Sequence, residues 1–173
     1  MQLRKVSSMS KELPELVELY ERAFPAKERW GMDMVLKDTT GISELYSFME
    51  GEAFLGFVIM LNYGALTHII YFAVDDRQRS RGIGSEALRQ IRALKPEQTI
   101  LVDIEREVPE ADNNDQRRRR KAFYERNGYE EAKVYYSWNG ENYEIMILGG
   151  KITSREYFRF WHSIDENSSI FEN

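Results

Sequence analysis

Residues 72–85 read FAVDDRQRSRGIGS, and this stretch decides the fold. Val74 ends an apolar run, a polar turn follows, and a helical pattern opens near Gly82 or Ile83. Gly82 and Gly84 are spaced so that the backbone can come close to a ligand. The first amides of a helix lack internal acceptors and lie at the positive end of its dipole, so they bind phosphate well. The stretch therefore predicts a strand, an anion-binding turn and a helix.

Two interpretations of the glycines remain open at this point. Arg77, Arg79 and Arg81 add positive charge, which favours a pyrophosphate cradle. Two glycines alone also fit a tight turn with no ligand. The stretch matches neither G-x-G-x-x-G nor G-x-x-x-x-G-K-[ST], so a Rossmann site and a P-loop are not supported.

The sequence before this stretch predicts helices followed by strands. Apolar residues recur at helical spacing from Leu13 to Phe24, with Ser10 as the expected N-cap and Pro25 at the end. A second, short helix is expected at residues 32–37. Strands are expected at residues 44–49, 53–61 and 66–74, as an antiparallel meander. The last two runs are apolar on both faces, which predicts a sheet covered on both sides.

The sequence after this stretch alternates helices and strands. The helix that opens at Gly82 ends before Pro96, and a short apolar strand follows at residues 99–104. A helix at residues 117–127 ends on Gly128, and Asn139-Gly140 joins strands 131–138 and 141–149 as a hairpin. Thr153 and Glu156 form a capping box for a last helix with an aromatic stripe.

This order of elements predicts a mixed α+β fold with a mostly antiparallel sheet that contains one parallel strand pair. Helices would flank the sheet, with an extra helix at the C-terminus. The main domain is expected at residues 1–149 and a helical extension of it at residues 150–173. The aromatic stripe of the extension would pack on the domain or against a second subunit, as in a homodimer.

The composition excludes several classes of protein. The 173 residues carry 24 basic and 29 acidic side chains, a net charge of −5, which argues against a nucleic-acid binder. The absence of cysteine excludes disulfides and thiolate catalysis, and the two histidines argue against a metal centre. No signal peptide or membrane-spanning segment is recognisable, so no membrane partner and a cytoplasmic location are expected.

The basic run from Arg117 to Lys121 has three possible roles. On a helix, five consecutive residues spread around the whole circumference. A solvated helix surface is therefore the first interpretation, a contact with a phosphate group the second and nucleic-acid binding the third.

Two segments resemble a known family. Arg79-Ser80-Arg81-Gly82-Ile83-Gly84 matches the R/Q-x-x-G-x-G/A signature of the GNAT superfamily of N-acetyltransferases. Residues 122–129, AFYERNGY, resemble the second conserved segment of that family, and the element order of residues 3–149 also resembles its fold. One departure concerns Arg117, because relatives often have asparagine at that position.

The resemblance implies an acetyl-CoA site in a cleft where the strands at residues 66–74 and 99–104 splay apart. Tyr124 matches the tyrosine that faces the thioester sulfur in many members, and its phenol suits general acid catalysis. A plain core tyrosine is the other interpretation. The residues expected to bind the cofactor are Phe72, Ala73, Val74, Arg79, Ser80, Arg81, Gly82, Ile83, Gly84 and Ser85.

Transfer to an amine also needs removal of a proton, and two residues are candidate bases. His68 lies on the strand that enters the cofactor site, and an imidazole can accept a proton at neutral pH. Glu105 follows the strand at residues 99–104. The alternative role of His68 is a histidine hydrogen-bonded within the sheet, and that of Glu105 is a solvated loop carboxylate. Many relatives in the family use a water chain instead.

The resemblance predicts direct acetyl transfer from acetyl-CoA to a primary amine of a small molecule or peptide, without a metal. The acidic residues Glu105, Glu107, Glu110, Asp112 and Asp115 form either a solvated loop, which is the first interpretation, or a negative rim that attracts cations. Phe24, Glu28 and Trp30 are weaker candidates for the acceptor pocket. A non-catalytic CoA-binding regulatory module is the main alternative, and an RNA-binding domain that uses the basic run is a distant one.

Overall fold

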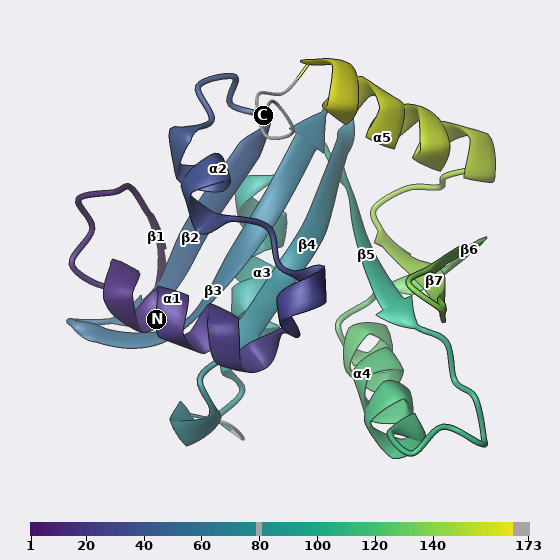
Figure 1. The fold of residues 1–173 in the computed structure, drawn as a ribbon, viewed down its shortest axis with the longest axis horizontal. Helices are drawn as coiled ribbons and strands as arrows, with labels where there is room; N and C mark the ends of the chain where they lie inside the picture. Colours follow the sequence, from purple (N-terminus) through teal and green to yellow (C-terminus); the bar gives the residue numbers. More distant parts are fainter. Residues whose placement is uncertain (79–80, 168–173) are drawn as a thin grey trace.

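The computed structural model describes residues 1–78 and 81–167 and contains one seven-stranded sheet in the order β1-β2-β3-β4-β5-β7-β6 (Figure 1). All neighbouring strands are antiparallel except β4 and β5, which are parallel. The strands are β1 (Gln2–Lys5), β2 (Ser43–Glu50), β3 (Ala53–Tyr63), β4 (Leu66–Val74), β5 (Thr99–Glu105), β6 (Glu130–Trp138) and β7 (Glu141–Leu148). The expected mixed fold, with one parallel pair in a mostly antiparallel sheet, is confirmed.

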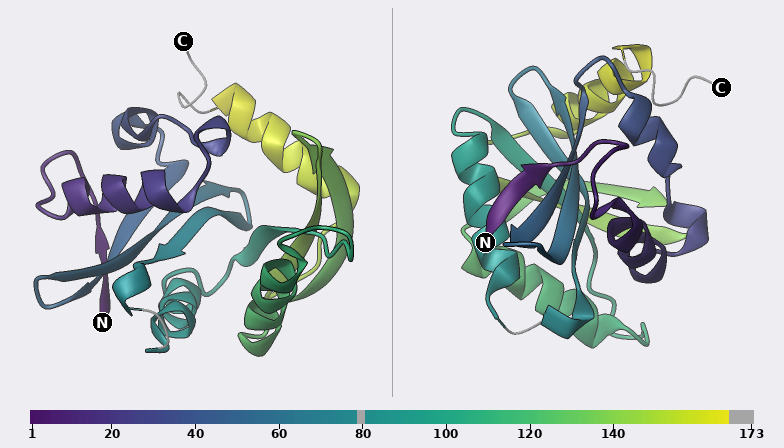
Figure 2. Two further views of the ribbon diagram at one scale, coloured as in Figure 1. Left: turned by 60° about the horizontal axis from the view of Figure 1, so that its bottom comes forward. Right: turned by 90° about the vertical axis from the view of Figure 1, so that its left-hand side faces the viewer.

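Helices cover both faces of the sheet (Figures 1 and 2). The buried faces of α1 and α2 pack on one side and that of α3 on the other, with Tyr124 of α4 in the same core as α3. Eight successive residues of β3 are buried, as expected for a strand covered twice. The helices are α1 (Leu13–Ala23), α2 (Met32–Lys37), α3 (Ile83–Leu94), α4 (Asn114–Arg126) and α5 (Ser154–Asn167), with short 3-10 turns η1 (Ala26–Glu28) and η2 (Asp76–Gln78).

The parallel pair separates partway along its length. β4 pairs with β5 only from Leu66 opposite Thr99 to Ile69 opposite Val102. The register of β4 against β3 shifts next, because Ile70 is an extra residue between Ile69 and Tyr71. Such a bulge bends its strand, so β4 leaves β5 at this point, and Figure 1 shows the two strands diverging.

The start of the chain differs from the prediction. Residues 2–5 form an edge strand that the pattern did not reveal, because four residues are too short to show alternation. Ser10 does not cap α1: the helix begins at Leu13 after Glu12, and Ser10 Oγ instead accepts a hydrogen bond from the Ser7 amide.

Local signals elsewhere gave correct predictions. The short helix at residues 32–37 is α2, and Asn139 and Gly140 both have positive φ in the β6–β7 turn. Gly128 has a positive φ of 85° after α4. The Thr153 amide donates to Glu156 Oε2 and the Glu156 amide to Thr153 Oγ1, which completes the capping box.

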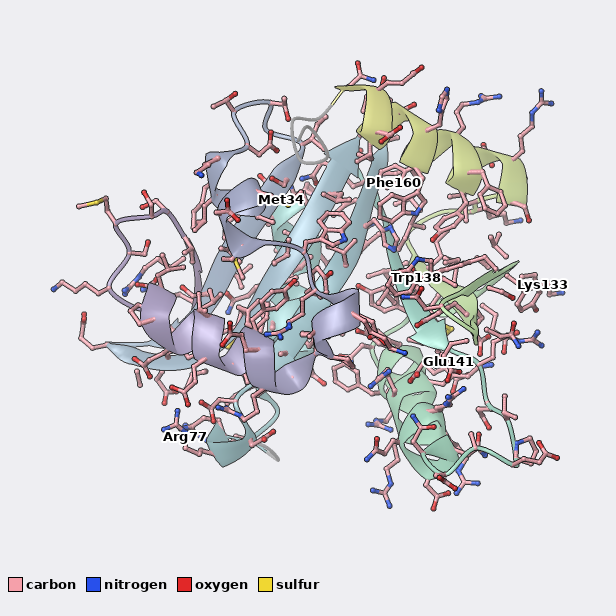
Figure 3. All side chains as sticks on the ribbon, in the orientation of Figure 1. Met34, Arg77, Lys133, Trp138, Glu141 and Phe160 are labelled. Carbon is pink, nitrogen blue, oxygen red and sulfur yellow. The ribbon has the colours of Figure 1, made fainter. Side chains whose placement is uncertain are left out.

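The aromatic stripe of α5 packs on the sheet of its own chain. Tyr157, Phe160 and Ile164 are buried, and Phe160 shares a core with Leu61 of β3. In Figure 3, Phe160 points from α5 toward the sheet. This contact places α5 over the end of the sheet where β4 and β5 are still paired.

Candidate active site

A cleft of about 650 Å³ opens where β4 and β5 separate. Its walls come from five parts of the chain: the end of α1 with η1, strands β4 and β5, helix α4, the β6–β7 hairpin, and α5. A second hollow of about 360 Å³ shares Phe24, Phe72 and Arg120 with the cleft and continues along Ala73 and Val74. The two hollows therefore form one trough beside the free edge of β4.

The free edge of β4 carries the strand part of the predicted cofactor site. Phe72, Ala73 and Val74 pair on one edge with Val58, Phe57 and Gly56 of β3. In residues 1–78 and 81–167, no strand pairs with the opposite edge beyond Ile69. Backbone amides and carbonyls there still require partners, which an extended ligand can supply.

The turn after β4 leads directly to the N-terminus of α3. Gly82 has a φ of 72°, in the left-handed region, and it precedes Ile83, whose side chain is buried under the helix. Ser85 is exposed in the first turn. Arg81 donates to Gln78 Oε1 (2.6 Å) and to Glu50 Oε2 (2.9 Å). The predicted cofactor residues Arg79 and Ser80 lie outside the described residues.

Gly84 lies close to α4. A Cβ at this position would lie 3.0 Å from Cζ of Phe123, a tight contact that requires the ring to shift by a few tenths of an ångström. The two glycines of the motif differ in this respect, because a Cβ on Gly82 would meet no atom within 4 Å.

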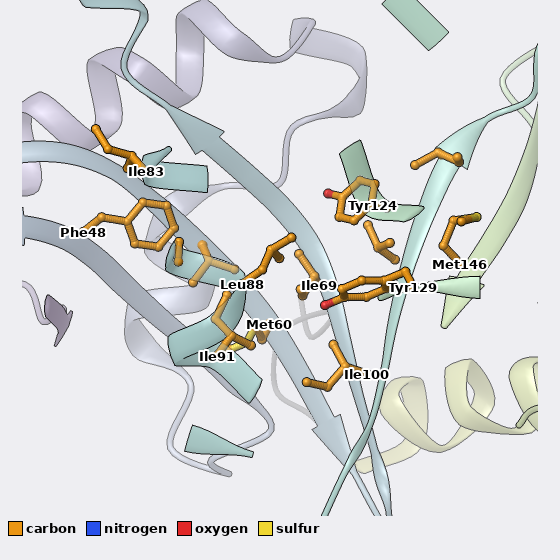
Figure 4. Packing of buried hydrophobic residues seen from close by; sticks show 14 of the residues in the cluster. Phe48, Met60, Ile69, Ile83, Leu88, Ile91, Ile100, Tyr124, Tyr129 and Met146 are labelled. Carbon is orange, nitrogen blue, oxygen red and sulfur yellow. The ribbon is translucent and has the colours of Figure 1, made fainter. Parts of the chain in front are cut away.

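Tyr124 projects from α4 into the cleft. Its side chain is 5% exposed and packs against the rings of Phe123 and Tyr129. Figure 4 shows its hydroxyl pointing away from Met146. Burial raises the pKa of the phenol above its ordinary value of 10.0, so the group keeps its proton at neutral pH.

His68 does not reach the cleft, and its expected role as a direct base needs correction. The side chain is fully buried, enclosed by the rings of Tyr157, Phe160 and Trp161. Its Nε2 is hydrogen-bonded to Asp103 Oδ1, and its Nδ1 is buried without a partner among the described residues. Because α5 covers this part of β4, the imidazole can contact an acceptor only through Asp103.

Asp103 is the residue that sequence analysis missed. It lies on β5 directly after the last parallel pair, it lines the cleft, and its side chain is 17% exposed. Oδ2 accepts hydrogen bonds from the hydroxyls of Tyr136 and Tyr157. One available signal was an acidic residue inside the apolar run TILVDIE, because a charged side chain in a central strand needs partners.

The environment of Asp103 keeps its carboxylate charged. Burial alone would raise the pKa, but the neighbouring His68 and the hydrogen bonds from His68 and Tyr136 outweigh it. The pKa of Asp103 therefore lies below its ordinary value of 3.8. At neutral pH a negative charge stands in the acceptor side of the cleft.

Glu105 also lines the cleft, but its oxygens are already engaged by arginines of α4. Arg120 Nη1 lies 3.2 Å from Oε2, and Arg117 Nη2 lies 3.6 Å from Oε1. The side chain is 22% exposed. A proton transfer at Glu105 would have to displace or share these contacts.

Most of the expected acidic rim lies elsewhere. Of the five loop carboxylates, only Glu105 lines the cleft. Asp115 pairs with Arg118 on the exposed side of α4. Of the loop at residues 106–113, Asn113 lines the cleft but carries no charge, so the loop does not surround the cleft with carboxylates.

Within the basic run, Arg118, Arg119 and Arg120 are exposed, as its interpretation as solvated helix surface predicts, whereas Arg117 is buried. Its guanidinium donates to Asn113 Oδ1 (2.8 Å), to the Arg106 carbonyl (3.0 Å) and to Glu141 Oε2 (2.9 Å). These bonds tie the loop and the hairpin to α4. Lys121, at the other end of the run, pairs with Glu131 and Glu144, so the run forms no continuous basic surface.

Phe24, Glu28 and Trp30 all line the cleft, on the wall formed by α1 and η1. Two tyrosine hydroxyls hold this segment. Tyr71 donates to the Glu28 carbonyl (2.5 Å), and the Trp30 amide donates to the Tyr20 hydroxyl (2.8 Å). The segment is thereby fixed at the cleft, where the Trp30 ring contacts Trp161 of α5.

Two further findings concern the described part of the chain as a whole. Within residues 1–78 and 81–167, histidine and carboxylate side chains form no group of three placed to hold a metal ion. Among the helices described, none has the length and apolar character needed to cross a membrane.

Solved structures with the same fold are numerous. A GNAT-family acetyltransferase of Bacteroides thetaiotaomicron superimposes with a TM-score of 0.77 at 18% identity, over 95% of this chain and 96% of that one. An aminoglycoside 6'-N-acetyltransferase in complex with coenzyme A gives 0.66 at 16% identity, over 86% and 96%. The ribosomal-protein-S18-alanine N-acetyltransferase of Escherichia coli gives 0.60 at 19% identity, over 88% and 96%.

The sequence comparison identifies the family. No significant match was found among curated proteins. The family model described as an acetyltransferase (GNAT) domain matches residues 42–131, which run from β2 to the start of β6 and include Tyr124 and the turn before α3. The chain therefore belongs to the GNAT family of acetyltransferases.

Proposed function

We propose that this protein transfers an acetyl group from acetyl-CoA directly to a primary amine of a small molecule or peptide. The observation that carries the proposal is the separation of β4 from β5 after Ile69, with Tyr124 on one side of the resulting cleft and Asp103 on the other. A thioester and an amine can meet there from opposite sides of the sheet.

The residues present suit coenzyme A. The unpaired edge at Phe72, Ala73 and Val74 offers amides and carbonyls to an extended pantetheine arm. The left-handed Gly82 and the first amides of α3 suit a pyrophosphate, since they are donors at the positive end of a helix. The bound cofactor supplies the activated acetyl group, and related structures contain coenzyme A.

Tyr124 is the general acid of the proposed reaction. Tyr124 lines the cleft, and its hydroxyl holds its proton at neutral pH because burial raises the pKa of the phenol. Proton transfer from this oxygen to the departing sulfur would avoid release of a free thiolate. The same burial also suits a core residue, so turnover of a Tyr124→Phe variant decides its role.

The proton of the acceptor ammonium has two candidate routes. Glu105 can accept it directly, although Arg117 and Arg120 occupy its oxygens. Asp103 can accept it with His68 as the residue that positions the carboxylate, through the bond from Nε2 to Oδ1. His68→Gln and Glu105→Gln variants separate the routes, because the variant that disrupts the route in use should show the larger loss of kcat.

Acetyl-CoA turnover against a panel of amines tests the proposal. Free thiol release is monitored with amines of four classes: monoamines, polyamines, aminoglycosides and peptide N-termini. The protein has no cysteine and gives no thiol background. Amine-dependent thiol release with at least one class is expected. Binding of CoA without amine-dependent release would instead support the non-catalytic regulatory module.

A further inference from the structure

Asp103 occupies a distinctive position in the cleft. Glu105, which also lines the cleft, pairs with arginines, whereas the described contacts of Asp103 come from one imidazole and two phenols. These donors lie on β4, β6 and α5 and hold the carboxylate in one orientation. The side chain nevertheless keeps 17% of its surface exposed, on the cleft side.

Aromatic rings line the same cleft as this carboxylate. Six of them, here called the aromatic wall, come from the segment between α1 and α2, from β4, from β7 and from α5: Phe24, Trp30, Tyr71, Tyr143, Phe158 and Trp161. Trp30 bridges two elements, with ring centroids 6.1 Å from Tyr71 and 6.2 Å from Trp161. Ring faces attract cations and bury flat apolar groups, so the wall suits both an ammonium and an aromatic body.

The charges that face the cleft leave a negative excess. Glu28, Asp103 and Glu105 line it, together with the cation of Arg120. Arg120 lies against Glu105 at 3.2 Å, so it compensates that carboxylate and not Asp103. Because a partly buried charge surrounded by rings is poorly solvated, a cationic ligand at Asp103 gains more than it would in water.

Asp103 shares the cleft with rings of two strands, because Tyr71 of β4 and Tyr143 of β7 line it as well. Burial raises the pKa of both phenols, and the charges of Glu28 and, less strongly, Asp103 raise it further. A ligand small enough to bind Asp103 would contact the aromatic wall at the same time.

We propose that Asp103 is the specificity-determining residue that binds the acceptor's ammonium, and that the acceptor is an arylalkylamine whose aromatic body lies against the aromatic wall. This inference rests on the proposed function, because it names the substrate class of the same site. Polycationic acceptors fit less well, since four of the five loop carboxylates lie outside the cleft and Glu105 is engaged by arginines.

Direct binding to the unmodified protein, without acetyl-CoA, gives the first test. Calorimetry at about pH 7 compares phenethylamine with phenethyl alcohol, which has the same ring but no charge. The amine should bind about 10- to 100-fold more tightly, the usual contribution of a hydrogen bond to a charged group. Equal affinities would overturn the role of a carboxylate. Tighter binding of spermidine or kanamycin than of phenethylamine would overturn the arylalkylamine assignment.

The Asp103→Asn variant tests whether Asp103 is the carboxylate that binds the ammonium of phenethylamine. It keeps the size of the side chain, and it should bring the affinity for phenethylamine down to that for phenethyl alcohol. Glu107→Gln is the matched control, because Glu107 is exposed on the loop and does not line the cleft. An Asp103→Asn variant that keeps the preference for the amine would overturn the proposal.

Measurement of acetylation, in addition to binding, separates this inference from the proposed function. Phenethylamine that binds through Asp103, while no amine of the panel is acetylated, would contradict the proposed function and leave the binding site intact. Acetylation of phenethylamine with an affinity that does not depend on Asp103 would contradict the inference and leave the function intact.

Discussion

The two sides of the cleft are built differently. The cofactor side consists of the free edge of β4, the turn at Gly82 and the start of α3, all within a short continuous stretch of sequence. The acceptor side combines η1, β5, the β6–β7 hairpin and α5, which are far apart in the sequence. A short continuous segment can carry a recognisable motif, whereas a surface assembled from distant segments leaves none. The following variants test this division, from the largest expected effect to the smallest.

Tyr124→Phe tests whether the chemistry belongs to the cofactor side. Removal of the phenol proton donor should lower kcat by about 100-fold, the lower range for loss of a general acid. Because burial raises the pKa of Tyr124, the unmodified enzyme should show no rate loss from ionisation of this phenol up to about pH 10. The affinity for CoA, measured by calorimetry, should not change. Unaltered turnover would show that Tyr124 is a core residue.

Arg117→Met tests the connection between the two sides. Arg117 ties the loop after β5 and the β6–β7 hairpin to α4, so its loss leaves Glu141 and the Arg106 carbonyl without this donor. We expect the free energy of unfolding to fall by about 2 kcal/mol, less than for a fully buried pair because Glu141 is 40% exposed. Arg119→Met, at an exposed position of the same run, is the control and should have no effect in urea unfolding. Equal stabilities of both variants would contradict the anchoring role.

Gly82→Ala tests the cradle itself. Both Gly82 and Gly64 have positive φ (72° and 58°), and a Cβ would meet no atom at either position. Alanine should therefore cost about 1 kcal/mol of stability at each. Only Gly82→Ala should also weaken CoA binding, by about fivefold, because Gly64 lies in the β3–β4 turn at the opposite end of the strand. Equal CoA affinities in the two variants would disprove the cradle.

Asp75→Asn tests the bonds between Asp75 and Arg77 at the start of the turn that follows β4. Hydrogen bonds from Arg77 lower the pKa of this buried carboxyl to about 2. A lowered pKa contributes stability above the ordinary value of 3.8, and this contribution is lost as the pH falls toward 2. The variant should lose under about 1 kcal/mol at neutral pH, because Arg77 is exposed to solvent. Its stability should also vary less between about pH 4 and 2 in acid titrations. If the stability of the variant depends on pH in this range as strongly as that of the unmodified protein, the result would argue against the Asp75–Arg77 pair.

Local patterns predicted most of the fold. Elements that depend on neighbouring residues are visible in the sequence. They include the meander, the crossover helix, the hairpin at Asn139-Gly140 and the capping box at Thr153. The edge strand at residues 2–5 was missed because its pairing with β2 comes from residues some forty positions away. Phe24, Glu28 and Trp30 were placed at the cleft by the family resemblance and not by any pattern of their own.

By itself, the sequence determined the turn at Gly82, the family and the tyrosine on α4, because these depend on residues close together in the chain. Only the tertiary structure decided that Asp103 faces the cleft while His68 stands behind it, and that Arg117 is buried. Spacing along a strand shows which residues share a face, but not which of them a distant helix will cover. In this protein α5 covers His68 and leaves Asp103 open, and that contact defines the acceptor side.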